Sequence, residues 1–176
     1  MGRGRDQTPP GFGFSRKVPK KITYEKVLLD CRDEVSAFLD SARRLGAKLL
    51  CCLLQFGSFN RTAFATMGAF LDRLDPFLSA WPADVPVTVE VGNKAWMVEA
   101  MGECLVRHNA VGVLPAQVWM PSPLSVVQRL DALTGPFAYV RLLGDREAVM
   151  PSPRRWITSS STAAIRWRSI RRQSGC

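Results

Sequence analysis

The sequence predicts an α/β fold, a partial (β/α) barrel of the TIM type with about five parallel strands and covering helices. Short runs that are apolar on both faces alternate with helical patterns along the middle of the chain. One polar residue stands near the C-terminal end of each strand, whereas an open sheet would need such residues only at its crevice. No glycine-rich phosphate loop of the GxGxxG or GxxxxGK[ST] type follows any strand.

The first two predicted strands flank a helix. Alternating aromatic residues in GFGFSRKVP predict a strand over 11–19, and the apolar run KLLCCLLQF predicts another over 48–56. Between them, apolar residues spaced as on one helix face predict a helix over 25–46; they are Val35, Phe38, Leu39 and Ala42. Acidic residues come early in this stretch, arginines come late, and Gly46 follows, which suits the helix dipole and a glycine stop.

The second half repeats the alternation. AFATMGAFLDRLDPFLSAW predicts a helix over 63–81, in which Pro76 predicts a kink or a break. VPVTVEVGNKAW predicts a buried strand whose odd-numbered valines, from Val85 to Val91, pack beneath helices while Glu90 points to the other face. Gly92 then gives the backbone freedom to turn. The remaining elements are a helix over 96–109, a strand over 110–117, a helix over 123–132 and a strand over 137–144.

Polar residues at these strand ends define a candidate ligand site at the mouth of the barrel. They are Lys17, Gln55, Glu90, Gln117 and Arg141, with Asn93 as a further hydrogen-bonding group. A carboxylate flanked by valines needs a partner or an unusual pKa, so Arg141 is its expected counter-ion and Lys17 the second choice. The alternative is that these residues are polar strand ends that meet water and share no role.

Cysteine and histidine usage argues against several kinds of site. The five cysteines are odd in number and show no CxxC spacing, so we expect reduced, structural thiols. His108 is the only histidine, which makes a histidine-based zinc site or serine–histidine catalysis hard to assemble. We therefore expect no metal and no cofactor, and we identify no catalytic nucleophile.

Composition indicates a globular protein of the cytoplasm. The hydrophobic fraction is 47%, and no apolar run approaches the roughly 18 to 20 residues that cross a bilayer, so no membrane partner is expected. No hydrophobic segment follows the N-terminal arginines, so we expect no secretory signal. The net charge of +9 is concentrated at the two ends, with +5 over residues 1–21 and +6 over 151–176.

Several stretches, taken together, resemble the YecE-like family, the domain of unknown function 72. They are FGFSRKVPKKIT, LGAKLLCCLLQFGSFNRTAF, FLDRLDPFL, VTVEVGNKAW, QVWMP and FAYVRLLGDRE, which run from about residue 11 to 147. The resemblance implies an eight-stranded barrel of the TIM type with a phosphate or anion site at its mouth. It implies no reaction, because the family's role is not settled.

The chain departs from this family pattern in four places. The family's first two strands and its eighth strand have no counterpart here. Gly92 replaces an arginine that usually follows the glutamate, and Ala116 replaces an acidic residue before Gln117. We therefore divide the chain into a basic extension (1–10), a partial barrel (11–147) and a disordered or irregular basic tail (148–176). The tail lacks acidic residues after residue 150 and any strand pattern, so we hypothesise that it is a frameshift product.

Three hypotheses for function remain open. The first is a barrel that binds a phosphate-bearing or otherwise anionic small molecule, in which Lys17 and Arg141 hold the anion and Glu90 acts as acid, base or orienting group. The second is nucleic-acid binding through the basic ends, where Trp156 and Trp167 interleave with arginines and could stack on bases. The third is an inactive fragment with open sheet edges that pair with a partner or aggregate.

Overall fold

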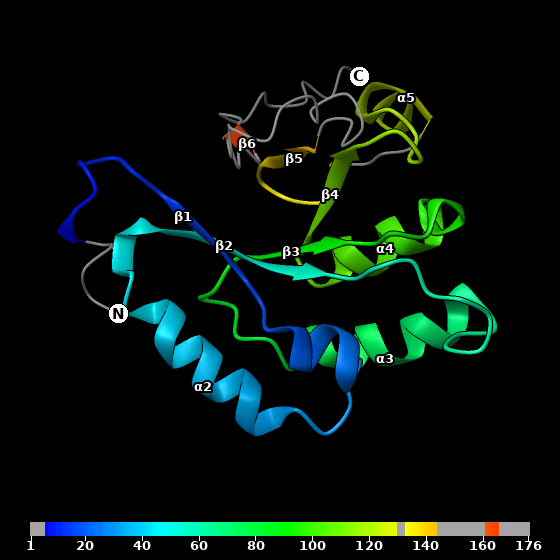
Figure 1. Ribbon diagram of the computed structural model, residues 1–176, viewed down its shortest axis with the longest axis horizontal. Coiled ribbons are helices and arrows are strands. Elements are labelled where there is room, and N and C mark those ends of the chain that lie inside the picture. Colours follow the sequence, from blue (N-terminus) through cyan, green and yellow to red (C-terminus); the bar gives the residue numbers. More distant parts are fainter. Residues whose placement is uncertain (1–5, 130–132, 144–160, 166–176) are drawn as a thin grey trace, which may run out of the picture. The chain divides into compact units, whose positions relative to one another are not determined.

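The predicted alternation of strands and helices is present in a computed structural model of the chain, which describes residues 6–129, 133–143 and 161–165 (Figure 1). The chain forms two compact units, Met1–Trp96 and Met97–Cys176. Within each unit, successive β-strands joined through helices run parallel, as in part of a (β/α) barrel. The predicted α/β class and partial-barrel type are therefore confirmed.

The sheet of the first unit has three parallel strands in chain order: β1 (Phe14–Lys17), β2 (Leu49–Gln55) and β3 (Val87–Glu90). The backbone of β1 pairs so that Lys17 lies opposite Leu53, which in turn lies opposite Thr88. Two residues further along, Gln55 lies opposite Glu90. This register puts the C-terminal ends of the strands at one edge of the sheet, where the loops to the helices begin.

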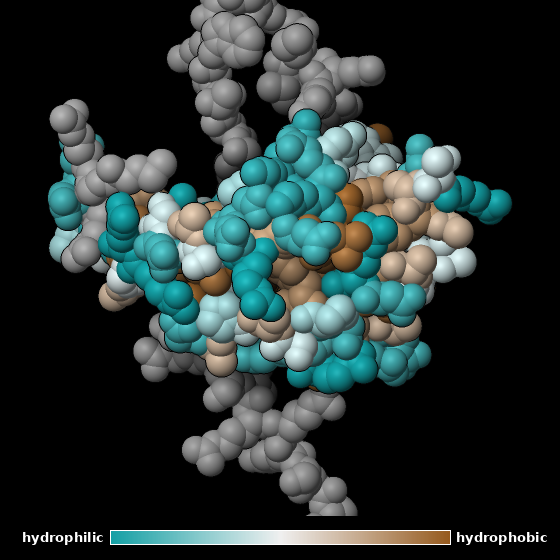
Figure 2. Space-filling view, turned by 90° about the horizontal axis from the view of Figure 1, so that it is seen from below, coloured by the Kyte–Doolittle hydropathy of each residue, from teal (hydrophilic) through white to brown (hydrophobic). Residues whose placement is uncertain are grey.

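Two long helices lie on the same side of this sheet, α2 (Arg32–Arg43) and α3 (Met67–Ser79) (Figure 1). The buried residues of α2 are Phe38, Leu39 and Ala42, and those of α3 are Phe70, Leu74 and Leu78. Both sets follow helical spacing, so each helix turns one apolar stripe inward. Figure 2 looks onto the side of these helices and shows hydrophilic side chains over it, with apolar ones visible between them. The described residues of this unit also form three short helical elements: η1 (Lys21–Glu25), η2 (Gly46–Lys48) and η3 (Lys94–Trp96).

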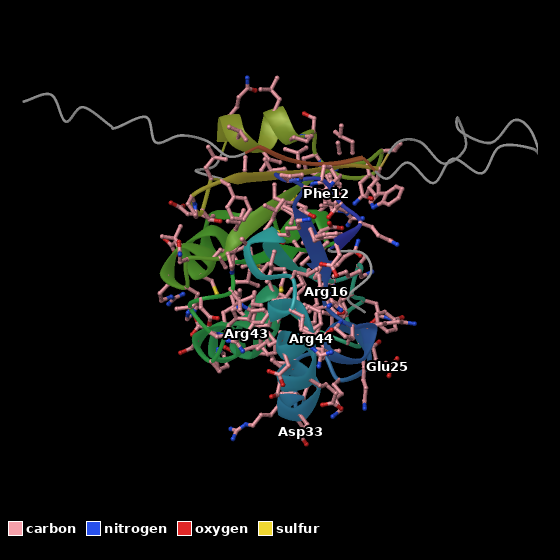
Figure 3. All side chains as sticks on the ribbon, turned by 90° about the vertical axis from the view of Figure 1, so that its left-hand side faces the viewer. Phe12, Arg16, Glu25, Asp33, Arg43 and Arg44 are labelled. Atoms are coloured by element: carbon pink, nitrogen blue, oxygen red, sulfur yellow. The ribbon has the colours of Figure 1, made fainter. Side chains whose placement is uncertain are left out.

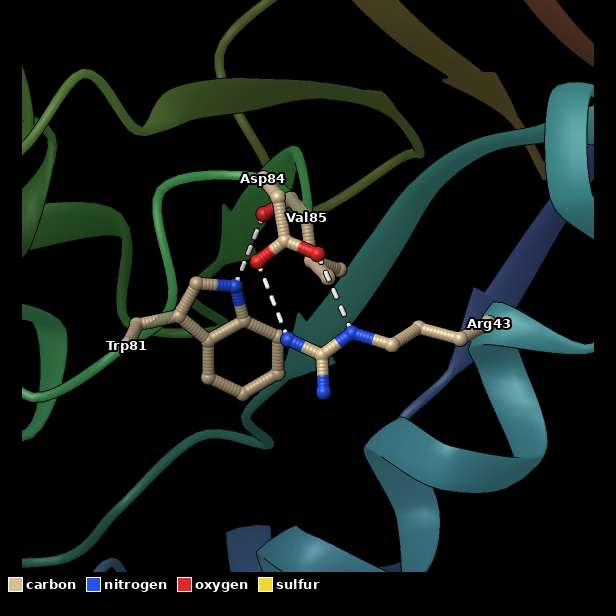
Figure 4. Close-up of polar contacts among 4 residues, drawn as sticks. All are labelled: Arg43, Trp81, Asp84 and Val85. Atoms are coloured by element: carbon tan, nitrogen blue, oxygen red, sulfur yellow. Dashed lines mark hydrogen bonds and ion pairs between the residues drawn. The ribbon is translucent and has the colours of Figure 1, made fainter.

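Charged residues stabilise both ends of α2. Asp33 lies in its first turn and Arg43 in its last, which complements the helix dipole (Figure 3). The guanidinium of Arg43 donates two hydrogen bonds to the carboxylate of Asp84, at 3.0 and 2.9 Å, and so ties the helix to the turn before β3 (Figure 4). In the same turn, the indole nitrogen of Trp81 donates to the carbonyl of Val85 at 2.9 Å. These contacts fix where β3 enters the sheet.

Pro76 does not break α3, which excludes one of the two predicted outcomes, while a kink at this residue stays a prediction. The helix runs from Met67 to Ser79, and the amide of Ala80 donates to the carbonyl of Pro76 at 3.1 Å. Proline removes one hydrogen bond, to the carbonyl of Asp72. Because Pro76 and Asp72 are both exposed, water can satisfy that carbonyl and the helix continues.

The helix predicted from residue 25 begins seven residues later, because the chain first forms a strained loop. Val27, Leu28 and Asp30 have φ angles of 43°, 69° and 44°. This left-handed region costs non-glycine residues roughly 1–2 kcal/mol each, and it cannot be continued as a right-handed helix. Among the described residues, Asn109 is the one other non-glycine residue with positive φ. The apolar periodicity of Val35 to Ala42 located the helix but carried no signal for its start.

The second unit contains α4 (Glu99–Arg107), β4 (Val111–Ala116), α5 (Pro123–Arg129) and β5 (Ala138–Leu142). β4 and β5 are parallel. The predicted helix over 96–109 is thus shorter than expected and begins at Glu99. No strand is predicted in the tail, whereas Ser161–Ile165 forms β6, antiparallel to β5. Strand pairing needs only backbone N–H and C=O groups, so it can occur without an alternating side-chain pattern.

None of the helices that the structure describes combines the length and the apolar character that a membrane span requires.

Removing the Phe70 side chain tests the core of the first unit. Phe70 is fully buried and contacts four aromatic rings, so we expect Phe70→Ala to lower the unfolding free energy by about 3–5 kcal/mol. Urea denaturation followed by circular dichroism measures this change. Phe12→Ala is the control, because Phe12 is 45% exposed and its loss should cost much less. Equal losses would contradict the assignment of Phe70 to the core.

Glu34 makes the unfolding free energy depend on pH in acid. Hydrogen bonds from Lys21 and then Lys26 lower the pKa of Glu34 from 4.5 to about 2. A carboxylate whose pKa is depressed by folding stabilises the folded state above pH 4.5, and that contribution is lost as the pH falls towards 2. We expect Glu34→Gln to be less stable than the parent at pH 7, with the difference shrinking between pH 4.5 and 2. A difference that stays constant over this range, in urea titrations, would contradict the assignment.

Candidate functional site

The C-terminal ends of β2 and β3 bring a carboxylate and an amide into direct contact. Gln55 and Glu90 are register partners, and the side-chain nitrogen of Gln55 donates to Oε1 of Glu90 at 2.8 Å. Glu90 is only 4% exposed. A buried carboxylate must accept hydrogen bonds to remain charged at acceptable cost. The Gln55 amide therefore orients the Glu90 carboxylate and supplies one of these bonds.

Lys17 lies on the same face of the sheet as this pair. Register partners in a sheet point to one side, and side chains two residues apart along a strand share a face. Lys17 is opposite Leu53, which precedes Gln55 by two residues, so all three share the face of Glu90. Lys17 is exposed, whereas Gln55 is partly buried. A cation accessible to solvent thus stands on β1, on the same side as the buried pair.

The opposite face of the sheet packs against helix α2. Arg16 donates to the carbonyl and the hydroxyl of Ser41, at 3.0 and 2.9 Å, and its guanidinium lies over the ring of Phe38 at 5.4 Å. Val87 and Val89 alternate with Thr88 and Glu90 along β3, so they share the face of Arg16. For Val87 and Val89, the prediction that the valines pack on the helical side while Glu90 points away from it is confirmed.

Asn93 connects the two loops that follow β2 and β3. Its side-chain oxygen accepts from the amide of Phe59 at 2.7 Å, and its side-chain nitrogen donates to the carbonyl of Phe59 at 2.8 Å. Both ends of the Asn93 amide are therefore occupied by the backbone of one residue. Its predicted role in ligand binding is untested, but the structure gives it a definite role in loop position.

Gly92 lets these two loops touch. A Cβ atom at residue 92 would lie 2.6 Å from the amide nitrogen of Ser58 and 2.7 Å from the carbonyl carbon of Gly57. Backbone atoms cannot move aside as a flexible side chain can. The requirement for glycine here is the close approach of two backbones, rather than the turning freedom that the sequence suggested.

An aromatic cluster, Phe56, Phe59, Phe64, Phe70 and Trp96, packs the same loops against α3. The Trp96 ring stacks on Phe70 and on Phe59, with centroids 5.0 and 5.9 Å apart, and Phe64 meets Phe70 edge to face at 5.4 Å. Such ring pairs add stability beyond their buried area. Four phenylalanines fall within residues 56–70, but their spacing along the chain follows no single period that would predict a common cluster.

Gln117 and Arg141 belong to the second unit. Arg141 lies opposite Pro115 in the β4–β5 register, and Gln117 follows two residues after Pro115. The carbonyl of Gln117 accepts from the amide of Met120 at 3.0 Å, which begins the turn after β4. The six candidate residues are therefore split four and two between the units, and their common mouth remains a prediction.

The buried cysteines of β2 are poor nucleophiles. Burial raises the pKa of Cys52 to about 12 and also raises the pKa of Cys51, so neither thiol ionises readily at neutral pH. The described cysteines form no disulfide with one another, in agreement with structural thiols. The Gln55–Glu90 pair alone also offers too few oxygen ligands for a calcium or magnesium ion.

Of the basic ends invoked for nucleic-acid binding, the C-terminal arginines with Trp156 and Trp167 lie outside the described residues, as do Arg3 and Arg5. That hypothesis remains a prediction from the sequence.

Alanine at residue 92 tests the contact between the two loops. We expect Gly92→Ala to lower the unfolding free energy by roughly 1–3 kcal/mol, because the added methyl group meets backbone atoms. Gly57→Ala is the matched control in the same loops, since its Cβ would meet nothing within 4 Å. Thermal unfolding of both variants checks this, and two equally stable variants would mean that the loops do not touch.

Comparison with solved structures supports the fold. The crystal structure of a protein from Thermotoga maritima aligns with this chain with a TM-score of 0.62 and 21% sequence identity. The alignment covers 81% of this chain and 53% of the other. One from Enterococcus faecalis aligns with a TM-score of 0.53 and 21% identity, covering 77% and 55%. The chain thus spans about half the length of these proteins. No curated protein matches it in sequence.

Both structures are described as DUF72 family proteins, and the family's sequence model, described as "Protein of unknown function DUF72", matches residues 3–173. The matched range is longer than residues 11–147, from which the resemblance was drawn, and it includes most of the tail. The chain therefore belongs to the DUF72 family.

Proposed function

We propose that this DUF72 chain binds a small molecule that carries both a phosphate or similar anion and hydroxyl groups. The Gln55–Glu90 pair, set on the same sheet face as the exposed Lys17, is the observation that carries the proposal. The ammonium of Lys17 and the carboxylate of Glu90 recognise different parts of such a ligand. A sugar phosphate has the required chemistry.

Lys17 is suited to the anionic part of the ligand. Its ammonium is accessible to solvent and stands at the C-terminal end of β1. Lysine binds phosphate oxygens through charge-assisted hydrogen bonds. C-terminal strand ends are also where parallel α/β folds build their ligand sites.

Glu90 is suited to the hydroxyl groups. A carboxylate accepts hydrogen bonds from hydroxyls and repels an anion, so the phosphate must be held away from it. The Gln55 amide fixes one carboxylate oxygen at 2.8 Å, which orients the group before any ligand arrives. Asn93 and the aromatic cluster also hold together the loops that follow β2 and β3. These contacts support the preorganisation of the carboxylate.

The buried cysteines without disulfides support a cytoplasmic location for the protein as part of this proposal. The roles of Gln117 and Arg141 as further ligand residues stay predictions, and no reaction is proposed.

Isothermal titration of the full chain with inorganic phosphate and with a hexose phosphate tests the proposal. We expect Lys17→Ala to weaken binding of both by roughly tenfold or more, because each loses a charge-assisted hydrogen bond. Glu90→Gln should weaken the binding of the hexose phosphate alone, since inorganic phosphate offers no sugar hydroxyls. Arg44→Ala is the matched control, an exposed cation at the far end of α2.

The proposal fails if the parent chain binds neither compound. It also fails if Arg44→Ala weakens binding as much as Lys17→Ala, because the effect would then be one of net charge.

A further inference from the structure

The loop of residues 26–31, which leads from η1 to α2, concentrates backbone strain. Three of its six residues adopt left-handed φ angles although none is glycine, and one of them, Val27, is β-branched. Such residues persist only where their surroundings enforce the conformation, and they are typical of switch regions and ligand sites. The loop lies between β1, which carries Lys17, and α2.

One ammonium group closes this loop. Nζ of Lys26 donates to the carbonyl of Asp30 at 2.6 Å and forms an ion pair with Oε1 of Glu34 at 2.7 Å. Glu34 belongs to the first turn of α2, so Lys26 joins both ends of the strained segment to the helix. Lys21 reaches the same carboxylate oxygen at 2.8 Å.

Burial of Leu28 and Cys31 and several backbone hydrogen bonds also hold the loop. The amide of Leu28 donates to the carbonyl of Ile22 at 2.9 Å, and the amide of Leu29 donates to the carbonyl of Lys26 at 3.1 Å. From α3, Arg73 reaches the carbonyl of Val27 at the long distance of 3.5 Å. These bonds report whether the loop is closed.

We propose that residues 26–31 form a conformational switch, in which backbone strain favours opening and the ammonium of Lys26 keeps the loop closed. Loss of that charge, or competition for it by another anion, opens the loop. Because β1 enters this connection directly after Lys17, opening alters access to the candidate site. The switch itself does not depend on ligand binding.

Ordinary acid is not the trigger. The pKa of Glu34 is held at about 2 by Lys21 and Lys26, so its carboxylate stays charged at any ordinary pH. The other titratable groups nearby are Glu25, Asp30 and Cys31, and burial raises the pKa of the Cys31 thiol, which therefore stays neutral. The switch therefore responds to loss of the positive charge on Lys26 or to competition for that charge.

Amide hydrogen exchange by NMR tests the switch at Leu28 and Leu29, with the amide of Val18 as an internal reference in the sheet. We expect Lys26→Met to speed exchange at Leu28 and Leu29 by roughly tenfold or more without affecting Val18. Lys48→Met is the matched control. Lys48 likewise donates to a backbone carbonyl and to a side-chain oxygen, both of Thr8, at 2.8 and 2.9 Å.

Relief of strain distinguishes a switch from a simple structural contact. In Val27→Gly/Lys26→Met, glycine accepts the positive φ, so exchange at Leu28 and Leu29 should return towards the parent rate after correction for the sequence change. If the double variant exchanges as fast as Lys26→Met, or if Lys26→Met leaves the rates unchanged, the proposal is wrong. Should Lys26→Met fail to fold, rising salt applied to the parent chain gives the same readout: selective acceleration at Leu28 and Leu29 supports the switch, and none overturns it.

Discussion

The register between β2 and β3 is the constraint on which the site depends. Side chains alternate along a strand, so a slip of one residue would turn Glu90 towards α2 and the valines away from it. Burial of Val87 and Val89 opposes that slip, because both valines would leave the side on which α2 and α3 present their apolar stripes. The hydrogen bond between Gln55 and Glu90 is then a consequence of packing on the other face. Burial of Val87 and Val89 on one face of the sheet thus positions the Gln55–Glu90 pair on the opposite face.

The loops at the C-terminal strand ends of the first unit are held by two kinds of force. Those after β2 and β3 are fixed by close packing: the Asn93–Phe59 bonds, the aromatic cluster and the backbone contact at Gly92. The loop after β1 is fixed by charge, through Lys26 and Glu34, against an unfavourable backbone. Packing interactions respond little to ions, whereas salt screens the attraction within a partly exposed ion pair such as Lys26–Glu34. The C-terminal ends of these strands therefore carry two loops that are held by packing, after β2 and β3, and one loop that is held by an ion pair, after β1.

The sequence predicted most of the fold, because apolar periodicity reports which face of each element is buried. It identified five strands, which run parallel within each unit, and the orientation of Glu90. It did not predict outcomes that depend on the local backbone: α3 continues through Pro76 without a break because the carbonyl of Asp72 is open to water, and α2 starts late because Val27 and Leu28 turn left-handed. The pairing of Gln55 with Glu90 was not foreseen, since spacing along single strands does not give register between them. Gly92 shows the same limit: the family pattern suggests an arginine, yet any side chain there would meet the backbone of Ser58.

The contact between Gln55 and Glu90, on the face away from the helices, can be measured by a double-mutant cycle. The cycle compares the unfolding free energies of the parent, Gln55→Leu, Glu90→Leu and the double variant. We expect a coupling energy of about 1–3 kcal/mol, as for a hydrogen bond to a charged, buried group. Effects that add to within roughly 0.3–0.5 kcal/mol would show that the two side chains do not meet, and the site described above would then not exist.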